Sequence, residues 1–176
     1  MKKVEIVDLM DFCTEEMADQ GVDIDIFDPK GNFTGIVVNM KGTDSAAYLE
    51  EDTAIKRFNL SQGKKQQDFT AGMDPDEIKK ANLRRLKVCF NNWKQVIGEE
   101  DDGTRVYKDT IYIDKKELPS TKGQFGELMG RRGFFWFRRQ VEEGMDKVTN
   151  FLPPPKTISS PQQNSASSTT APTTME

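Results

Sequence analysis

Apolar residues near the start of the chain follow the two-residue period of β-strands. They alternate with aspartates over 22–26 (VDIDI), and an apolar, β-branched run occupies 33–40 (FTGIVVNM). Between these two segments, the turn-forming residues DPKGN stand at 28–32. The pattern predicts a β-hairpin at about 22–41.

Farther along the chain the apolar spacing changes to that of α-helices, and it predicts helices over about 44–60, 74–97 and 121–152. The second helix has the clearest start, because DPDE at 74–77 combines an N-cap aspartate, a proline in the first turn and a glutamate three residues after the cap. We expect it to end at Gly98. Its apolar stripe comprises Ile78, Ala81, Leu86, Cys89, Phe90, Trp93, Val96 and Ile97.

The first and last of these helices have weaker patterns. In the first, Tyr48, Ile55 and Phe58 keep an approximate helical spacing. The last is interrupted by GRRG at 130–133, and a short strand or extended connection is expected before it, over 106–113. The apolar face of the last helix comprises Phe134, Phe137, Val141, Met145, Val148 and Leu152.

Together these elements predict an α+β fold in which a small N-terminal β-hairpin is attached to a mainly α-helical body. Residues 153–176 are rich in Ser, Thr and Pro, and their only large apolar side chains are Ile158 and Met175. Such a segment buries too little apolar surface to offset the entropy lost on ordering. We therefore expect one domain over 1–152 and a disordered C-terminal tail over 153–176.

Composition narrows the possible functions. The 176 residues include no histidine, which excludes enzymes built on a Ser-His or Cys-His pair. The net charge of −4 argues against a protein whose purpose is to coat nucleic acid. The acidic runs at 23–28 and 99–102 lack the ligand spacing of an EF-hand, and no phosphate-binding glycine motif occurs. We expect no enzymatic activity, no metal and no cofactor.

The cysteines and the N-terminal sequence bear on location. Cys13 and Cys89 are far apart and outside any CxxC spacing, so the sequence supports neither a structural zinc site nor a disulfide framework. The N-terminal sequence lacks the apolar run of a signal peptide, and no later stretch has the roughly 18 apolar residues of a membrane span. We expect a reduced, cytosolic protein.

One segment combines arginines with aromatic residues: RRGFFWFRR at 131–139. Phe135 and Trp136 lie beside the core stripe of the last helix, where they widen it, and Arg138 and Arg139 follow them. A protein-binding surface is the favoured interpretation, because arginine and tryptophan are typical interface anchors. Plain core packing and the binding of single-stranded nucleic acid are the alternatives. Trp93 is a further candidate, as either a core residue or an interface anchor.

Several segments resemble the tail assembly chaperones of long-tailed bacteriophages. The first is VDIDIFDPKGNFTGIVVNMKGTDS, the second contains LRRLKVCFNNWKQVIG, and the last reads FFWFRRQVEEGMDKVTNFL. In that family a similar N-terminal stretch precedes helices that carry W-x-x-V and, near the end, Q-V. The matching positions are Asp28, Pro29, Thr34, Gly35, Val38, Gly42, Asp44, Ser45, Trp93, Val96, Gln140 and Val141.

The resemblance covers roughly residues 20–152, and it implies a role without catalysis. Members of the family bind the phage tape measure protein and help to recruit tail tube subunits. They act in the cytoplasm of the infected host cell and are absent from the mature virion. Apart from the resemblance, the apolar strip widened by Phe135 and Trp136 also suggests self-association. A minor structural protein of the phage neck or tail and a nucleic-acid-binding accessory protein using 131–139 are the alternative functions.

Overall fold

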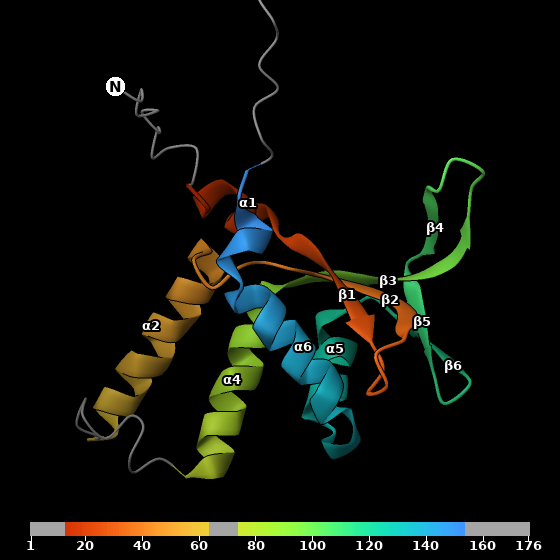
Figure 1. Cartoon of the computed structure of the whole chain (residues 1–176). Helices are drawn as coiled ribbons and strands as arrows, with labels where there is room; N and C mark the ends of the chain where they lie inside the picture. The colour runs from red at the N-terminus through yellow and green to blue at the C-terminus, as the bar shows by residue number, and fades with distance from the viewer. Residues whose placement is uncertain (1–12, 64–73, 154–176) are drawn as a thin grey trace, which may run out of the picture.

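The computed structural model describes residues 13–63 and 74–153, which form an α+β fold with two antiparallel sheets (Figure 1). A four-stranded sheet has the order β1-β2-β3-β4, and β5 and β6 form a separate hairpin. The strands are β1 (Val22–Phe27), β2 (Phe33–Met40), β3 (Phe90–Glu99), β4 (Arg105–Lys108), β5 (Thr110–Ile113) and β6 (Lys116–Pro119).

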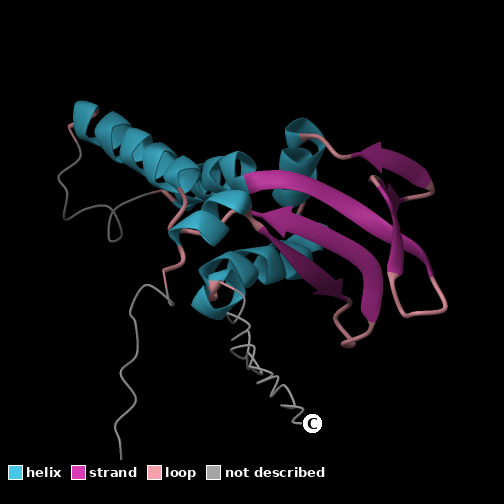
Figure 2. Cartoon of the chain, turned by 90° about the horizontal axis from the view of Figure 1, so that it is seen from above, coloured by secondary structure: helices cyan, strands magenta, loops and turns pink. Residues whose placement is uncertain are grey.

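The helices divide into two groups. The helices α5 and α6 pack against the larger sheet, whereas α2 and α4 lie side by side and extend away from it (Figures 1 and 2). The helix α4 also packs against α5, and its inner end contributes Leu86 and Cys89 to the core. We call α2 and α4 the arm, and the two sheets with α5 and α6 the body. The helices are α1 (Glu15–Gln20), α2 (Ala46–Ser61), α4 (Pro75–Cys89), α5 (Lys122–Gly130) and α6 (Phe135–Asp146), with the short 3-10 helices η2 (Arg132–Phe134) and η3 (Val148–Phe151).

The expectation of a small N-terminal hairpin on a mainly helical body is wrong. The strands β1 and β2 are the hairpin predicted at 22–41, but β3 pairs with β2 and extends the sheet through the middle of the chain. The strands β4, β5 and β6 follow over 105–119, where only a short strand or extended connection was expected. The sheet is therefore the centre of the body.

The helix predicted over 74–97 is also wrong in its second part, because α4 ends at Cys89 and β3 begins at Phe90. The sequence is misleading here because Phe90 and Trp93 are three residues apart, which is a helical spacing. In the structure Phe90 lies opposite Met40 and Trp93 opposite Val38, with a register shift between the two pairs. This bulge adds one residue to β3, so both aromatic side chains point into the core from a strand.

The element predicted over 121–152 is divided. The helix α5 ends at Gly130, and the next residue, Arg131, has an extended backbone (φ −72°, ψ 133°). The chain then forms η2, turns into α6 and leaves α-helical geometry after Asp146. The break lies at the GRRG sequence, where the glycines disfavour a continuous helix. It allows α5 and α6 to pack separately on the sheet.

An aromatic cluster fills the core of the body. Phe90, Trp93, Phe125 and Phe137 are each at most 1% exposed. The rings of Phe90 and Phe125 are stacked with centroids 4.2 Å apart, and the Trp93 ring lies 5.5 Å from that of Phe90. Such contacts add to the free energy gained by burying apolar surface. This cluster connects α5 and α6 to β3.

Close approach of α6 to the sheet requires a glycine. A Cβ atom at Gly144 would lie 2.6 Å from the Cδ1 atom of Ile24 on β1, which is closer than two carbon atoms can pack. The missing side chain therefore sets the distance between α6 and the sheet.

The residues predicted as a C-terminal tail lie outside the described residues from 154 onward.

Candidate protein-binding surfaces

Trp93 is a core residue of the body. It is 0% exposed, so its side chain cannot contact a partner directly. Its backbone N–H donates to Ser120 Oγ (2.8 Å), and its indole Nε1–H donates to the carbonyl oxygen of Leu118 (3.3 Å). Trp93 therefore fixes the segment that leads from β6 into α5.

The other four predicted residues lie together at the start of α6, and we call them the aromatic patch: Phe135, Trp136, Arg138 and Arg139. Phe135 is 55% exposed, and the Arg138 guanidinium lies 5.2 Å from the centre of its ring. Trp136 is only partly buried, with its ring in contact with Phe134 and Phe137. The exposed apolar part of the patch is therefore narrower than the sequence suggested, and Phe135 is its centre.

Three arginines of the segment 131–139 form ion pairs. Each pairs with a glutamate four positions away along the chain. A guanidinium paired in this way carries less net positive charge toward a phosphate than a free one does. This weakens the case for a nucleic-acid site. The pairs are Arg131–Glu127 (2.7 Å), Arg138–Glu142 (3.7 Å) and Arg139–Glu143 (2.6 Å).

The structure adds Gln140 to this surface as a residue that positions α6. Its Oε1 atom accepts a hydrogen bond from the N–H of Phe27 (2.9 Å), and its Nε2–H donates to the carbonyl oxygen of the same residue (2.8 Å). The side chain thus occupies the free edge of β1, where another strand could otherwise pair. No local sequence pattern indicates this role for Gln140, because the contact joins residues 113 positions apart in the chain.

The arm carries a second set of exposed apolar side chains that sequence reasoning missed. Phe58 was expected on the packed face of the first helix, but it is 58% exposed. Leu49, Leu60 and Ile78 are exposed as well. Only Ile55 and Asn59 of α2 are buried. The spacing of apolar residues along α2 gave no clear indication of which face packs.

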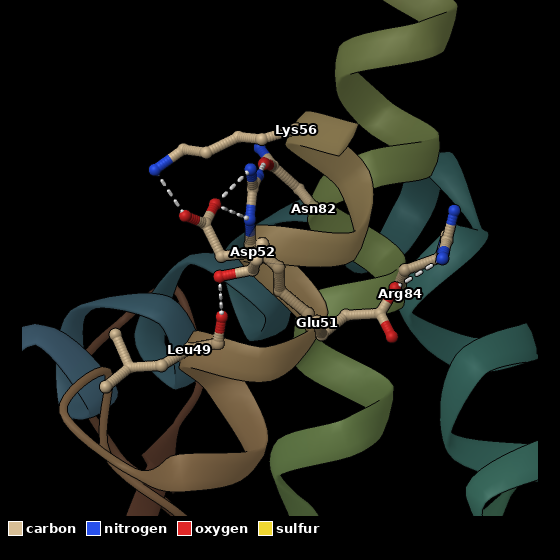
Figure 3. A network of polar contacts seen from close by, with 8 residues as sticks. Leu49, Glu51, Asp52, Lys56, Asn82 and Arg84 are labelled. Atoms are coloured by element: carbon tan, nitrogen blue, oxygen red, sulfur yellow. Dashed lines mark hydrogen bonds and ion pairs between the residues drawn. The ribbon is translucent and has the colours of Figure 1, made fainter. Parts of the chain in front are cut away.

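Polar contacts hold the arm together (Figure 3). The Nε and Nη2 groups of Arg85 on α4 both donate to Asp52 Oδ1 on α2 (3.1 and 2.8 Å). Lys56 lies 2.6 Å from the other Asp52 oxygen, and Arg84 pairs with Glu51 (2.6 Å). Burial alone would raise the pKa of Asp52, but the hydrogen bonds from Lys56 and Arg85 outweigh it and lower the pKa.

The described residues offer little to acid–base or metal chemistry. Over 13–63 and 74–153, no group of three or more Cys, Asp or Glu side chains is placed to hold a metal ion. Cys89 is buried, and burial raises the pKa of its thiol to about 11. A nucleophilic cysteine requires the opposite shift. What the arrangement can offer is exposed apolar and aromatic surface on a folded scaffold.

No protein-family model, curated protein or solved structure matches the chain. The likeness to tail assembly chaperones therefore depends on the sequence segments quoted above. In the described ranges, none of the helices is both long and apolar enough to cross a membrane.

Proposed function

We propose that this protein is a non-enzymatic tail assembly chaperone of a long-tailed phage. In this proposal it binds the tape measure protein in the host cytoplasm, assists assembly of the tail tube and does not enter the mature virion. The observation that carries the proposal is Phe135, an exposed aromatic side chain under an arginine on a helix fixed to the sheet. The resemblance in sequence supplies the identity of the client.

Two physical features support a binding role for the aromatic patch. Aromatic and arginine side chains dominate the binding energy of protein interfaces because they bury a large area with few rotatable bonds. In addition, Gln140 and the glycine at 144 fix α6 against β1, so little entropy would be lost when a partner binds. A long helical client could lay its apolar face against such a surface.

Co-expression with the tape measure protein of the same phage tests the proposal. We expect a complex that survives purification and is weakened by Phe135→Ala by about 30-fold, as for an interface residue worth about 2 kcal/mol. Val148→Ala is the matched control, because Val148 is similarly exposed (58%) but lies on η3, after α6 has ended. We expect the control to leave the affinity unchanged.

Two results would contradict the proposal. If no complex forms with the tape measure protein, the client is wrong. If the complex forms but Phe135→Ala and Val148→Ala bind equally well, the binding surface lies elsewhere. Detection of the chain in purified phage particles would instead favour a minor structural protein of the neck or tail.

A further inference from the structure

Most of the outward face of α2 is exposed among the described residues, and near the body Ala47, Glu50 and Ala54 also line a groove with Lys41 and Lys122. With 3.6 residues per turn, the face opposite the buried residues Ile55 and Asn59 carries Glu50 and Arg57, two turns apart. Thr53 and Ala54 lie between them, and all four are exposed. The exposed apolar residues Leu49 and Leu60 flank this face on one side, and Phe58 flanks it on the other.

This face is complementary to itself when two copies run in opposite directions. We propose that α2 pairs antiparallel with α2 of a second copy of this chain, around a two-fold axis that passes between Thr53 and Ala54. The two-fold axis places Glu50 of each copy opposite Arg57 of the other, giving two equivalent ion pairs. A contact of this kind, with the same patch on both subunits, is the usual way in which identical chains associate.

The apolar residues follow the same symmetry. Residues on one flank of α2 meet the same flank of the second copy, so Leu49 lies against Leu60 of the other chain. Phe58 lies over Ala47 of the other chain on the opposite flank. The small side chains at Thr53 and Ala54 let the two helix backbones approach closely at the centre. Every large exposed apolar side chain of α2 therefore gains a partner.

The charge pattern favours a second copy over a foreign helix. On the outward face of α2 the acidic Glu50 lies toward the body and the basic Arg57 toward the far end. The neighbouring charges Glu51, Asp52 and Lys56 are paired within the arm. An antiparallel copy brings each end against its opposite charge without needing any other sequence. The arms then point past each other, and the two bodies lie at opposite ends of the contact.

The length of α2 sets the expected strength. Its 16 residues span about 24 Å, so this is a small interface of the reversible kind, with a Kd on the order of 10–100 µM. The pairing uses α2 only and leaves the aromatic patch on α6 free. Dimer formation and client binding are therefore separate properties with separate tests.

Sedimentation equilibrium of the full chain at about 100 µM tests the pairing, with charge reversal as the probe. Glu50→Arg and Arg57→Glu each place like charges opposite one another, and we expect either change to weaken the dimer at least about tenfold. The double variant Glu50→Arg with Arg57→Glu restores opposite charges and should restore the dimer. Lys147→Glu, a charge reversal outside α2, should leave the dimer unchanged.

Rescue by the double variant cannot come from within one chain, because residues seven positions apart on a helix do not form ion pairs. A monomeric wild-type chain at this concentration would overturn the proposal. So would a dimer that is unaffected by both single variants, or a double variant as weak as either single one. Circular dichroism of each variant identifies any that has lost its fold. The variants that remain folded then decide whether α2 pairs with α2 of a second copy.

Disulfide cross-linking tests the direction of the pairing in a Cys13→Ser background. Ala54→Cys places two thiols next to the two-fold axis, and we expect a cross-linked dimer on oxidation. Ser61→Cys should not cross-link, because the antiparallel arrangement separates the two copies of residue 61 by about 22 Å along the helix axis. Cross-linking of both variants would indicate a parallel pair, and cross-linking of neither would indicate another interface; both results contradict the proposal.

Discussion

The body and the arm of this protein are held together in opposite ways. In the body, large aromatic side chains are buried among α5, α6 and the sheet, and the polar groups lie mainly at the margins. In the arm, the ion pairs Arg84–Glu51 and Arg85–Asp52 cross between α2 and α4. The buried apolar side chains Ile55 on α2 and Ala81 on α4 lie beside them, and Leu49, Phe58 and Leu60 face outward. The inner end of α4 contributes Leu86 and Cys89 to the core of the body, so the region that leaves apolar surface uncovered is chiefly α2.

The difference has energetic consequences. Burial of a large apolar side chain is worth roughly 1.5–3 kcal/mol, whereas an ion pair near the surface contributes about 0–1 kcal/mol. The body should therefore unfold as one cooperative unit, and α2 should open more easily. Uncovered apolar side chains on an easily opened helix are typical of a surface that a partner completes.

The largest expected effect on stability comes from truncating a buried side chain of the core. Trp93→Ala removes a fully buried side chain and the indole hydrogen bond to Leu118, and we expect the free energy of unfolding to fall by about 3–5 kcal/mol. Phe135→Ala removes an exposed aromatic side chain and should change it by less than about 0.5 kcal/mol. Urea unfolding followed by circular dichroism measures both. Equal losses would show that the core assignment is wrong.

A smaller loss is expected where α6 meets the sheet. Gly144→Ala forces a Cβ atom to within 2.6 Å of the Ile24 side chain, and we expect it to cost about 1–3 kcal/mol. Gly133→Ala is the control, because a Cβ atom there has no other atom within 4 Å. The same urea experiment compares the two. A neutral Gly144→Ala would mean that α6 does not pack as closely as described.

An arm variant should act locally. Asp52→Asn weakens the contacts of Arg85 and Lys56, and we expect a loss of about 1 kcal/mol or less. Hydrogen exchange should show faster exchange in α2 and unchanged exchange in β2. Glu50→Gln, measured in dilute monomer, removes a carboxylate from the opposite face of α2 and should have no such effect. A uniform change over the whole chain would contradict the division into body and arm.

The smallest effect is a dependence on pH. Because the pKa of Asp52 is lowered in the folded state, its stabilising contribution is complete above the unfolded-state value of about 4. It is lost as the pH falls through the lower folded-state pKa. We therefore expect the free energy of local opening of α2, after correction for the intrinsic pH dependence of amide exchange, to fall on acidification in this range, and Asp52→Asn to reduce that fall. If acidification affects the opening of α2 equally in Asp52→Asn and in the wild-type chain, another titrating group causes the pH dependence.

Local sequence patterns predicted those elements whose structure depends on near neighbours. The hairpin at 22–41 and the start of α4 at Pro75 depend on turn and capping residues that the sequence displays directly. The strand β3 could not be predicted in this way, because the bulge opposite β2 gives Phe90 and Trp93 a helical spacing. Pairing between strands about 50 residues apart decided that segment.

The candidate surfaces were predicted in part for a similar reason. Phe135 stands out in sequence because it lies beside the apolar stripe of its own helix. Trp93 has the residue type of an interface anchor, but its burial is set by α5, which follows it in the chain. Phe58 has the spacing of a core residue, yet Ile55 and Asn59 are the residues of α2 that are buried, and Phe58 lies at the rim of the groove between α2 and α4. Residue type suggested candidates, and tertiary packing decided which of them are exposed.

Native-state hydrogen exchange of the dilute wild-type chain tests the division into body and arm most directly. We expect the amides of β2, β3 and α6 to exchange only through global unfolding, with the highest protection in the chain. The amides of α2 should exchange through a local opening of lower free energy, while the body stays folded. Protection in α2 equal to that in β2, under conditions where the chain is monomeric, would contradict the account.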